Sequence, residues 1–127
     1  MGDFNDTYNS KMLTEVLRVN NELSNIQNEE LYNLSSLLAK KGEGSIKYRN
    51  RWQLVDMFII SGNMLKPSSN LYCSPNDIMV IKADFLLEYV PTNNNYRPKP
   101  TFRWIKYIGG YSDHLPILMQ LHIKHKK

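Results

Sequence analysis

The strongest constraint on the fold of this chain is a nearly continuous apolar run at residues 53–60, with the sequence Gln-Leu-Val-Asp-Met-Phe-Ile-Ile. The turn-forming residues Ser-Gly-Asn follow directly at positions 61–63. An apolar run of this length, rich in β-branched and aromatic residues, predicts a strand that is buried on both faces. Such a strand needs a covering layer on each side, which favours a layered α/β or α+β structure.

Further strands are predicted where apolar residues recur near the middle and the end of the chain. They span residues 78–81 and 117–123, with a weaker candidate at 102–108. Segments rich in Gly, Pro, Ser or Asn are expected to be loops, at 43–45, 66–70 and 90–100. In the last of these, three prolines and three successive asparagines are expected to prevent regular structure.

Two amphipathic helices are predicted before the first strand. One begins after the capping residues Asn9 and Ser10, and its apolar face consists of Met12, Leu13, Val16 and Leu17. The other runs from Glu29 to Lys41, and Gly42 follows it at the position typical of a helix C-terminus. The apolar stripe of this second helix consists of Leu31, Leu34, Leu37 and Leu38.

The composition is that of one globular domain. The 127 residues are 42% hydrophobic and 22% charged, which excludes a disordered, collagen-like or disulfide-stapled chain. The net charge is +4, and part of it lies in the tail Lys124–Lys127, which is either simply solvated or weakly attracted to polyanions. The single cysteine, Cys73, is expected to be a structural thiol. No apolar stretch reaches the roughly 20 residues of a membrane span, and no targeting signal is recognisable, so localisation stays open.

Ionisable and amide residues occupy three places that stand out from this background. They are Asp3 with Asn5 and Asp6, Asp56 within the apolar run, and Asp113 with His114. Each place also has an ordinary structural explanation: an Asx turn at 2–5, a loop cap at 56 and a solvated turn at 113–114.

Taken together, these residues match the requirements of phosphate-ester hydrolysis. An imidazole that is held in one tautomer needs a carboxylate on its other nitrogen, and Asp56 is a suitable partner for His114. Asp3 and Asp113 supply oxygen ligands of the kind that Mg²⁺ prefers, and Asn5 supplies a neutral donor for a phosphoryl oxygen. Such a set stabilises charge on the phosphoryl oxygens and orients and deprotonates a water molecule.

Three segments, in order, resemble motifs of the endonuclease/exonuclease/phosphatase superfamily, the group of deoxyribonuclease I, exonuclease III, sphingomyelinases and inositol-polyphosphate 5-phosphatases. They are Gly-Asp-Phe-Asn at 2–5, the run at 54–61 and Ser-Asp-His-Leu-Pro-Ile at 112–117. The surrounding frame is also similar, at 38–44, 47–49, 61–63 and 83–87. The resemblance therefore covers essentially the whole chain.

The resemblance implies hydrolysis of a phosphate ester with Mg²⁺ or Mn²⁺ as cofactor, on a nucleic acid, a phospholipid, or a sugar or inositol phosphate. Asp3 would orient and deprotonate the attacking water or bind the metal, and Asp113 would contribute to the metal site. Asn5 and His114 would contact the phosphate, and Asp56 would orient His114. Three further residues match nearby positions without a defined role: Asp6, Tyr48 and Ser112.

The resemblance also implies that residues 1–127 form only the C-terminal half of the family's domain. The family fold is a four-layer α-β-β-α sandwich, of which this half would build one mixed, mostly antiparallel sheet with flanking helices. The upstream half, with a metal-binding Glu, is expected to be missing. The isolated chain would then expose the inner face of its sheet, so we expect it to self-associate, to need the missing half, or to be marginally stable.

Two alternatives to hydrolysis stay open, a catalytically inactive remnant and an anion-binding or interaction module without the upstream Glu. The aromatic and basic segment 96–111 also has two interpretations. It contacts a substrate through stacking and phosphate pairing, or it is a β-hairpin with buried aromatic residues and solvated Lys and Arg.

Overall fold

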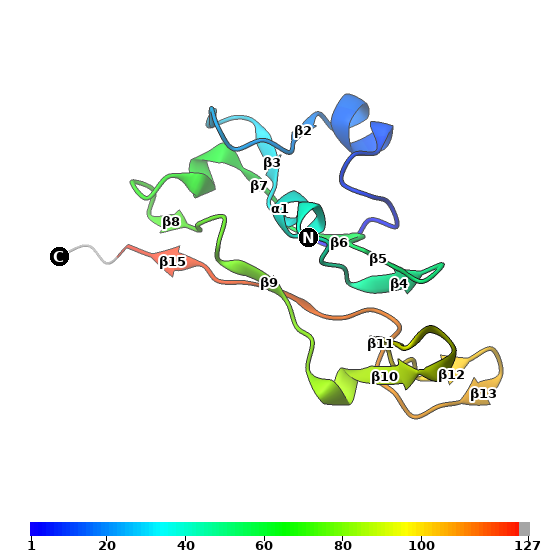
Figure 1. The fold of residues 1–127 in the computed structure, drawn as a ribbon. Coiled ribbons are helices and arrows are strands. Elements are labelled where there is room, and N and C mark those ends of the chain that lie inside the picture. The colour runs from blue at the N-terminus through cyan, green and yellow to red at the C-terminus, as the bar shows by residue number, and fades with distance from the viewer. Residues whose placement is uncertain (125–127) are drawn as a thin grey trace.

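The computed structural model of the chain describes residues 1–124 as a mixed α+β structure, mostly strands in small antiparallel sheets with few helices (Figure 1). The strands are β1 (Gly2–Asp3), β2 (Val19–Asn20), β3 (Leu31–Asn33), β4 (Ile46–Tyr48), β5 (Arg51–Gln53), β6 (Asp56–Met57), β7 (Ile59–Ser61), β8 (Leu71–Tyr72), β9 (Ile78–Val80), β10 (Leu87–Val90), β11 (Asn95–Pro98), β12 (Phe102–Arg103), β13 (Lys106–Tyr107), β14 (Ile117–Met119) and β15 (His122–Ile123). The helical elements are the α-helix α1 (Ser35–Lys40), the π-helical turn η1 (Met12–Val16) and the 3-10 turns η2 (Gly62–Leu65), η3 (Asp84–Leu86) and η4 (Pro91–Asn93). The mixed α and β class is therefore confirmed.

Two expectations from the sequence concern the basic tail and membrane-spanning segments. The predicted basic tail lies mostly outside the described residues, which end at Lys124. None of the helices within residues 1–124 is long and apolar enough to cross a membrane.

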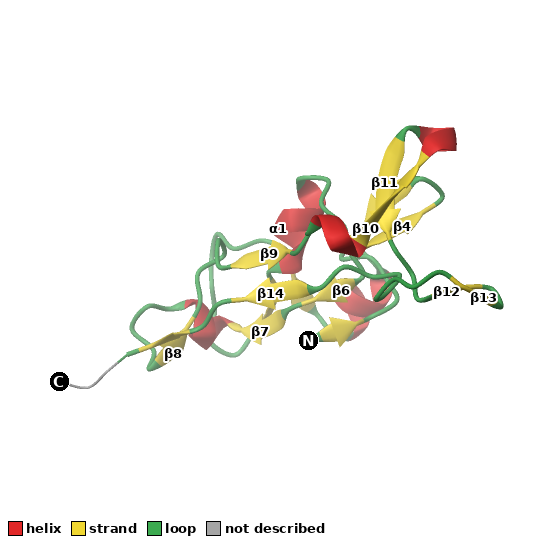
Figure 2. Cartoon of the chain, turned by 90° about the horizontal axis from the view of Figure 1, so that it is seen from below, coloured by secondary structure: helices red, strands yellow, loops and turns green. Residues whose placement is uncertain are grey.

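The strands pair mostly with neighbours in small antiparallel sheets. One sheet has three strands, with β3 in the middle, parallel to β2 and antiparallel to β7. The two-stranded antiparallel sheets are β1–β6, β4–β5, β8–β15, β9–β14, β10–β11 and β12–β13. Figure 2 shows β14 lying along β9, so the C-terminal segment returns to pair with the middle of the chain.

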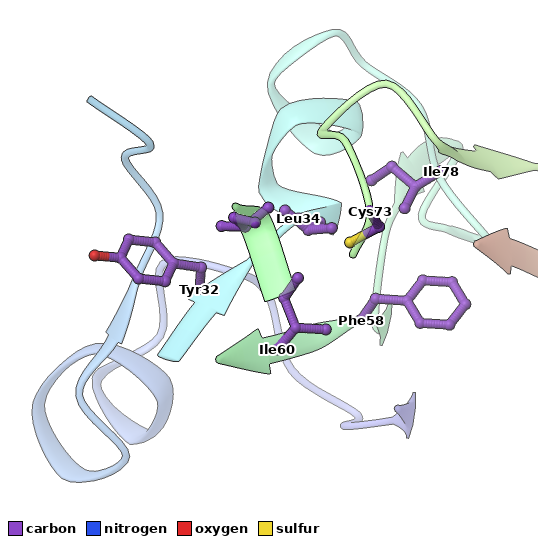
Figure 3. Packing of buried hydrophobic residues seen from close by; sticks show 7 residues of the cluster. Tyr32, Leu34, Phe58, Ile60, Cys73 and Ile78 are labelled. Carbon is purple, nitrogen blue, oxygen red and sulfur yellow. The ribbon is translucent and has the colours of Figure 1, made fainter. Parts of the chain in front are cut away.

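The core lies around β3, β7 and the residues that follow them. Its buried members are Tyr32, Leu34, Phe58, Ile60, Leu65, Cys73 and Ile78 (Figure 3). Burial raises the pKa of the Cys73 thiol, and the nearby Asp77 carboxylate raises it further. A buried, neutral thiol supports a structural role for this cysteine.

The apolar run at 53–60 is buried, as predicted, but it forms two short strands with an interruption at Phe58. The interruption has a local cause. The Phe58 N–H donates to Ser35 Oγ at 3.0 Å, and its carbonyl accepts from the Leu34 N–H at 3.1 Å. The backbone N–H and carbonyl of Phe58 are therefore bonded to the segment at the start of α1 and are not available for pairing with another strand.

The predicted helix from Glu29 to Lys41 is wrong in its first half. Residues 31–33 form the strand β3, and only Ser35–Lys40 are α-helical. Strand pairing with β7 and the burial of Tyr32, 1% exposed, outweigh the helical spacing of the leucines. The predicted end is correct, because Gly42 has a φ of +82° directly after the last turn.

The first predicted helix is reduced to the single turn η1. Leu13 is buried, but the rest of its expected apolar face is not, since Met12, Val16 and Leu17 are exposed. A helix of this length depends on tertiary packing of its apolar face for stability. The described residues provide that packing for Leu13 alone.

The segment 90–100 was expected to lack regular structure, and this prediction is wrong. Its ends belong to a hairpin, in which β10 and β11 are joined by η4 and by Asn94 with a φ of +46°. Asparagine tolerates this left-handed conformation. The expected last strand at 117–123 is also divided, because the Gln120 N–H donates to the Asp77 carbonyl at 2.8 Å between β14 and β15.

Candidate active site

The first two strands of the site bring together two carboxylates. In the antiparallel pair β1–β6, Asp3 lies directly opposite Asp56, and Gly2 lies opposite Met57. The Phe4 N–H donates to the Val55 carbonyl at 2.9 Å and extends the pairing. Figure 1 shows the N-terminus beside β6. Residues directly opposite each other in such a pair have neighbouring side chains on the same face, so the two acids form one acidic spot.

The loop 112–116 carries the histidine to this spot. The Leu115 N–H donates to the Ser45 carbonyl at 2.7 Å, and the Pro116 carbonyl accepts from the Ile81 N–H at 2.8 Å. Leu115 itself is only 2% exposed. The two residues directly after the histidine are therefore fixed to the body of the protein. Within the loop, the His114 N–H donates to Ser112 Oγ at 3.0 Å.

His114 and Asp56 are in direct contact. Nδ1 of His114 lies 2.8 Å from Oδ2 of Asp56. The two side chains are partly buried, 22% and 16% exposed respectively. A carboxylate at this distance accepts the Nδ1 proton, which leaves the other ring nitrogen, Nε2, for a further partner.

Asp3, Asp56 and His114 form a group suited to a cation. One ligand atom from each lies within 4.8 Å of those of the other two, and no other such group occurs within residues 1–124. Two adjacent carboxylates are the donors that Mg²⁺ uses when water and a substrate phosphate complete its shell. A cation would also offset the repulsion between two like charges side by side. The donor set therefore fits a divalent metal.

Asn5 lies next to this group, in a turn set by Asp3. Its N–H donates to Oδ1 of Asp3 at 2.7 Å, and its φ is +49°. The local structure is thus an Asx turn, the ordinary explanation for residues 2–5. Asn5 also lines a hollow of about 390 Å³ together with Asp6 and Tyr48, two of the residues without a defined role.

Asp113 occupies a different place from the one expected beside Asp3. It lines a second hollow together with Lys47 and Arg97, and the group of close ligand atoms contains Asp56 instead. In the sequence, the carboxylate of Asp56 was assigned only to His114. The opposition of Asp3 and Asp56 follows from strand pairing, and no local pattern in the sequence indicates it.

A second histidine–aspartate pair lies far along the chain, where the sequence indicated no site. Nε2 of His122 lies 2.9 Å from Oδ2 of Asp77, and its ring stacks on Tyr72 with centroids 5.0 Å apart. The same carboxylate oxygen accepts from the Ser74 N–H. The pair joins β15 to the segment directly before β9, and it has no third metal-ligating neighbour among the described residues.

Comparison with known proteins supports the motif assignment. A family model described as Endonuclease/Exonuclease/phosphatase family matches residues 1–123, a range that includes all three motif segments. Searches of curated proteins and of solved structures gave no match.

Proposed function

Because the chain belongs to the endonuclease/exonuclease/phosphatase family, we propose that it carries the central catalytic residues of a divalent-metal-dependent phosphoric ester hydrolase. The observation that carries this proposal is the convergence of Asp3, Asp56 and His114 from three separate segments of the chain. Family membership implies a phosphoester substrate. The metal dependence and the residue roles are our proposal.

Asp3 and Asp56 are the residues that would hold the metal, and Asp113, the sequence neighbour of His114, lies outside their group. When bound, Mg²⁺ or Mn²⁺ supplies positive charge that stabilises the charge developing on the phosphoryl oxygens. The two carboxylates also restrict where the substrate phosphate can lie, because a dianionic spot repels it unless a cation is present.

The remaining steps belong to the chain's own side chains. Asp3, whose Oδ1 is already oriented by the Asn5 N–H, would align the attacking water and accept its proton. The Asn5 amide would donate to a non-bridging phosphoryl oxygen. His114, held through Nδ1 by Asp56, would donate from Nε2 to a phosphoryl oxygen and stabilise the transition state.

The test is hydrolysis of bis-p-nitrophenyl phosphate by the purified chain. We expect release of p-nitrophenol in Mg²⁺ or Mn²⁺ and its loss in excess EDTA, because the acidic spot at Asp3 and Asp56 needs a cation to accept an anionic substrate. Restoring the metal should restore the rate, which separates removal of metal from damage to the protein. A folded chain that releases no p-nitrophenol with either metal would contradict the proposal.

One observation favours the alternative of a catalytically inactive remnant. The cation group contains two aspartates and a histidine but no glutamate within residues 1–124, whereas the resemblance implies a glutamate ligand. If hydrolysis fails, we expect Asp3, Asp56 and His114 still to bind Mn²⁺ weakly. The chain would then be an anion-binding or interaction module that keeps a residual metal site. The choice of substrate lies in the surrounding loops and not in these residues.

We also propose that these sheets are one half of a four-layer sandwich, with an apolar face that another polypeptide surface covers. The chain exposes 8742 Å², about a quarter more than the roughly 7,000 Å² expected for a compact monomer of its 14.9 kDa. Met79 and Leu118 are cross-strand partners in β9–β14, and they are 48% and 45% exposed. The pairs β9–β14 and β8–β15 together are here called the C-terminal arm. Further exposed apolar residues on this arm are Leu71, Leu121 and Ile123.

We expect the purified chain to self-associate through this arm. Exposed apolar area of this extent favours association, so sedimentation velocity should detect species larger than a monomer at micromolar concentration. The double variant Met79→Lys and Leu118→Lys is expected to weaken association by about tenfold or more. A wild-type chain that is monomeric, monodisperse and melts cooperatively would contradict this expectation.

A further inference from the structure

Three hollows lie around strand β4, near the candidate active site. The hollow that Asn5 lines shares Ile46 with a second hollow of about 400 Å³. The second shares Lys47 and Arg97 with a third, of about 160 Å³, and it also reaches Asp113, the neighbour of His114. The second and third hollows are here called the β4 groove, with the second as its central hollow and the third as its far one. They lie along β4 and β11, which lie against each other, and the central hollow adjoins His114 through Asp113.

Among the described residues that line the β4 groove, basic ones outnumber acidic ones, and Asp113 is the one carboxylate. Lys47, Arg97 and Arg103 line its central hollow, and Arg49 lines the far one. Glu88 pairs with Arg97 at 2.6 Å and also with Arg103, so one carboxylate holds two guanidinium groups. A guanidinium has five N–H donors, and the Glu88 contact uses one from each arginine. Donors for an additional anion therefore remain.

Lys47 adds a further positive charge and forms no direct ion pair with a carboxylate of the described residues. Its ammonium group lies 5.1 Å from the centre of the Trp52 ring, and Lys82 lies at the same distance from that ring. Burial, and after it the charge of Lys82, lowers the pKa of Lys47. A bound anion would relieve this crowding of positive charge.

The hairpin β12–β13, at the lower right of Figure 1, contributes aromatic residues to the lining of the central hollow. Phe102 and Trp104 line the central hollow and are 57% and 95% exposed. Trp104 has a φ of +55°, a left-handed conformation that is uncommon and costly for a bulky residue. Trp104 therefore combines an unfavourable backbone conformation with an almost fully exposed ring.

We propose that the β4 groove binds the phosphodiester backbone of a single-stranded nucleic acid, while Phe102 and Trp104 stack on its unpaired bases. The inference rests on the proposed function, since the bound strand would lead away from the phosphate that is hydrolysed. Proteins bind single strands by this combination of a basic groove that follows the backbone and aromatic stacking. A membrane surface would need a flat or convex patch, whereas Lys47 and Arg97 line successive hollows.

Binding is tested with the whole chain and a fluorescein-labelled oligodeoxythymidine of about 12 nucleotides, by fluorescence anisotropy in EDTA. Lys47→Gln and Arg103→Gln are each expected to weaken binding several-fold and to lower the slope of log K against log salt by about 0.7. Trp104→Ala is expected to raise the Kd by about tenfold. Lys11→Gln removes the same charge from an exposed position outside the groove and is expected to leave the Kd unchanged.

Three results would overturn the groove assignment. They are the absence of saturable binding, equal weakening by Lys11→Gln and Lys47→Gln, and binding to phosphatidylserine vesicles without binding to the oligonucleotide. The assay needs no turnover, so it separates this inference from the proposed hydrolysis. Oligonucleotide binding without cleavage of bis-p-nitrophenyl phosphate counts against the hydrolase alone, and cleavage without oligonucleotide binding counts against the groove alone.

Discussion

Replacement of His114 by alanine is expected to lower kcat/KM for bis-p-nitrophenyl phosphate by about 10²- to 10⁴-fold. The imidazole is fixed on both sides, by the backbone bonds of its loop and by Asp56 at 2.8 Å, so its donor to the phosphoryl oxygen is preorganised. Removing it leaves the acidic spot in place but no group to offset charge on that oxygen. Initial rates at saturating Mn²⁺ measure the loss.

The matched control for this variant is His122→Ala. His122 contacts Asp77 at 2.9 Å, so the two histidines have the same kind of partner, but His122 lies in β15 and outside the cation group. We expect His122→Ala to lower the melting temperature while kcat/KM of the folded fraction stays within about twofold of the wild type. Equal rates in His114→Ala and the wild type would remove His114 from the mechanism.

The residues of the candidate site could be predicted from the sequence because each is an unusual residue type at its position. Asp56 interrupts an apolar run, His114 lies in a polar turn before a predicted strand, and Asp3 lies in a polar turn before a predicted helix. In the structure Asp3, Asp56 and His114 converge, whereas Asp113 is not part of that group. The exact neighbours were not accessible, since the opposition of Asp3 and Asp56 depends on the register of β1 against β6.

The errors in the fold have a common physical origin in tertiary contacts. The leucine spacing at 31–38 is truly helical, yet residues 31–33 gain more from pairing with β7 than from a longer helix. The segment 90–100 contains helix- and strand-breaking residues. Asn94 adopts a left-handed conformation in the connection between β10 and β11, which allows the two strands to pair as a hairpin. The intrinsic secondary-structure preference of the residues decides the conformation of such segments only where no partner strand is available.

One of the two interpretations of segment 96–111 was a β-hairpin with buried aromatic residues. A hairpin forms at 102–107, but its aromatic residues are not buried. Phe102 and Tyr107 contact each other edge to face with centroids 5.4 Å apart, and both are more than half exposed. An alternating pattern identifies a strand without showing whether another layer covers it. The described residues provide no such layer here, so the aromatic pair stays at the surface.

The second large effect is expected from Asp56→Asn, which keeps the size of the side chain and removes its charge. A neutral amide still accepts the Nδ1 proton of His114 in one orientation, but in the other its NH₂ group faces the ring and favours the opposite tautomer. The substitution also removes one of the two carboxylates of the cation group. We therefore expect kcat/KM to fall by about 10²-fold or more.

Two measurements separate the positioning of His114 from metal binding. Two-dimensional ¹H–¹⁵N spectra of the imidazole should show the Nδ1–H form in the wild type and a mixture of tautomers in Asp56→Asn. The Mn²⁺ concentration for half-maximal rate should rise if Asp56 is also a ligand. Asp77→Asn, which alters the other histidine–aspartate pair, should change neither quantity at His114. An unchanged tautomer, an unchanged Mn²⁺ requirement and an unchanged rate in Asp56→Asn would together contradict both roles, because a carboxylate 2.8 Å from the ring cannot orient it and yet be replaced without effect.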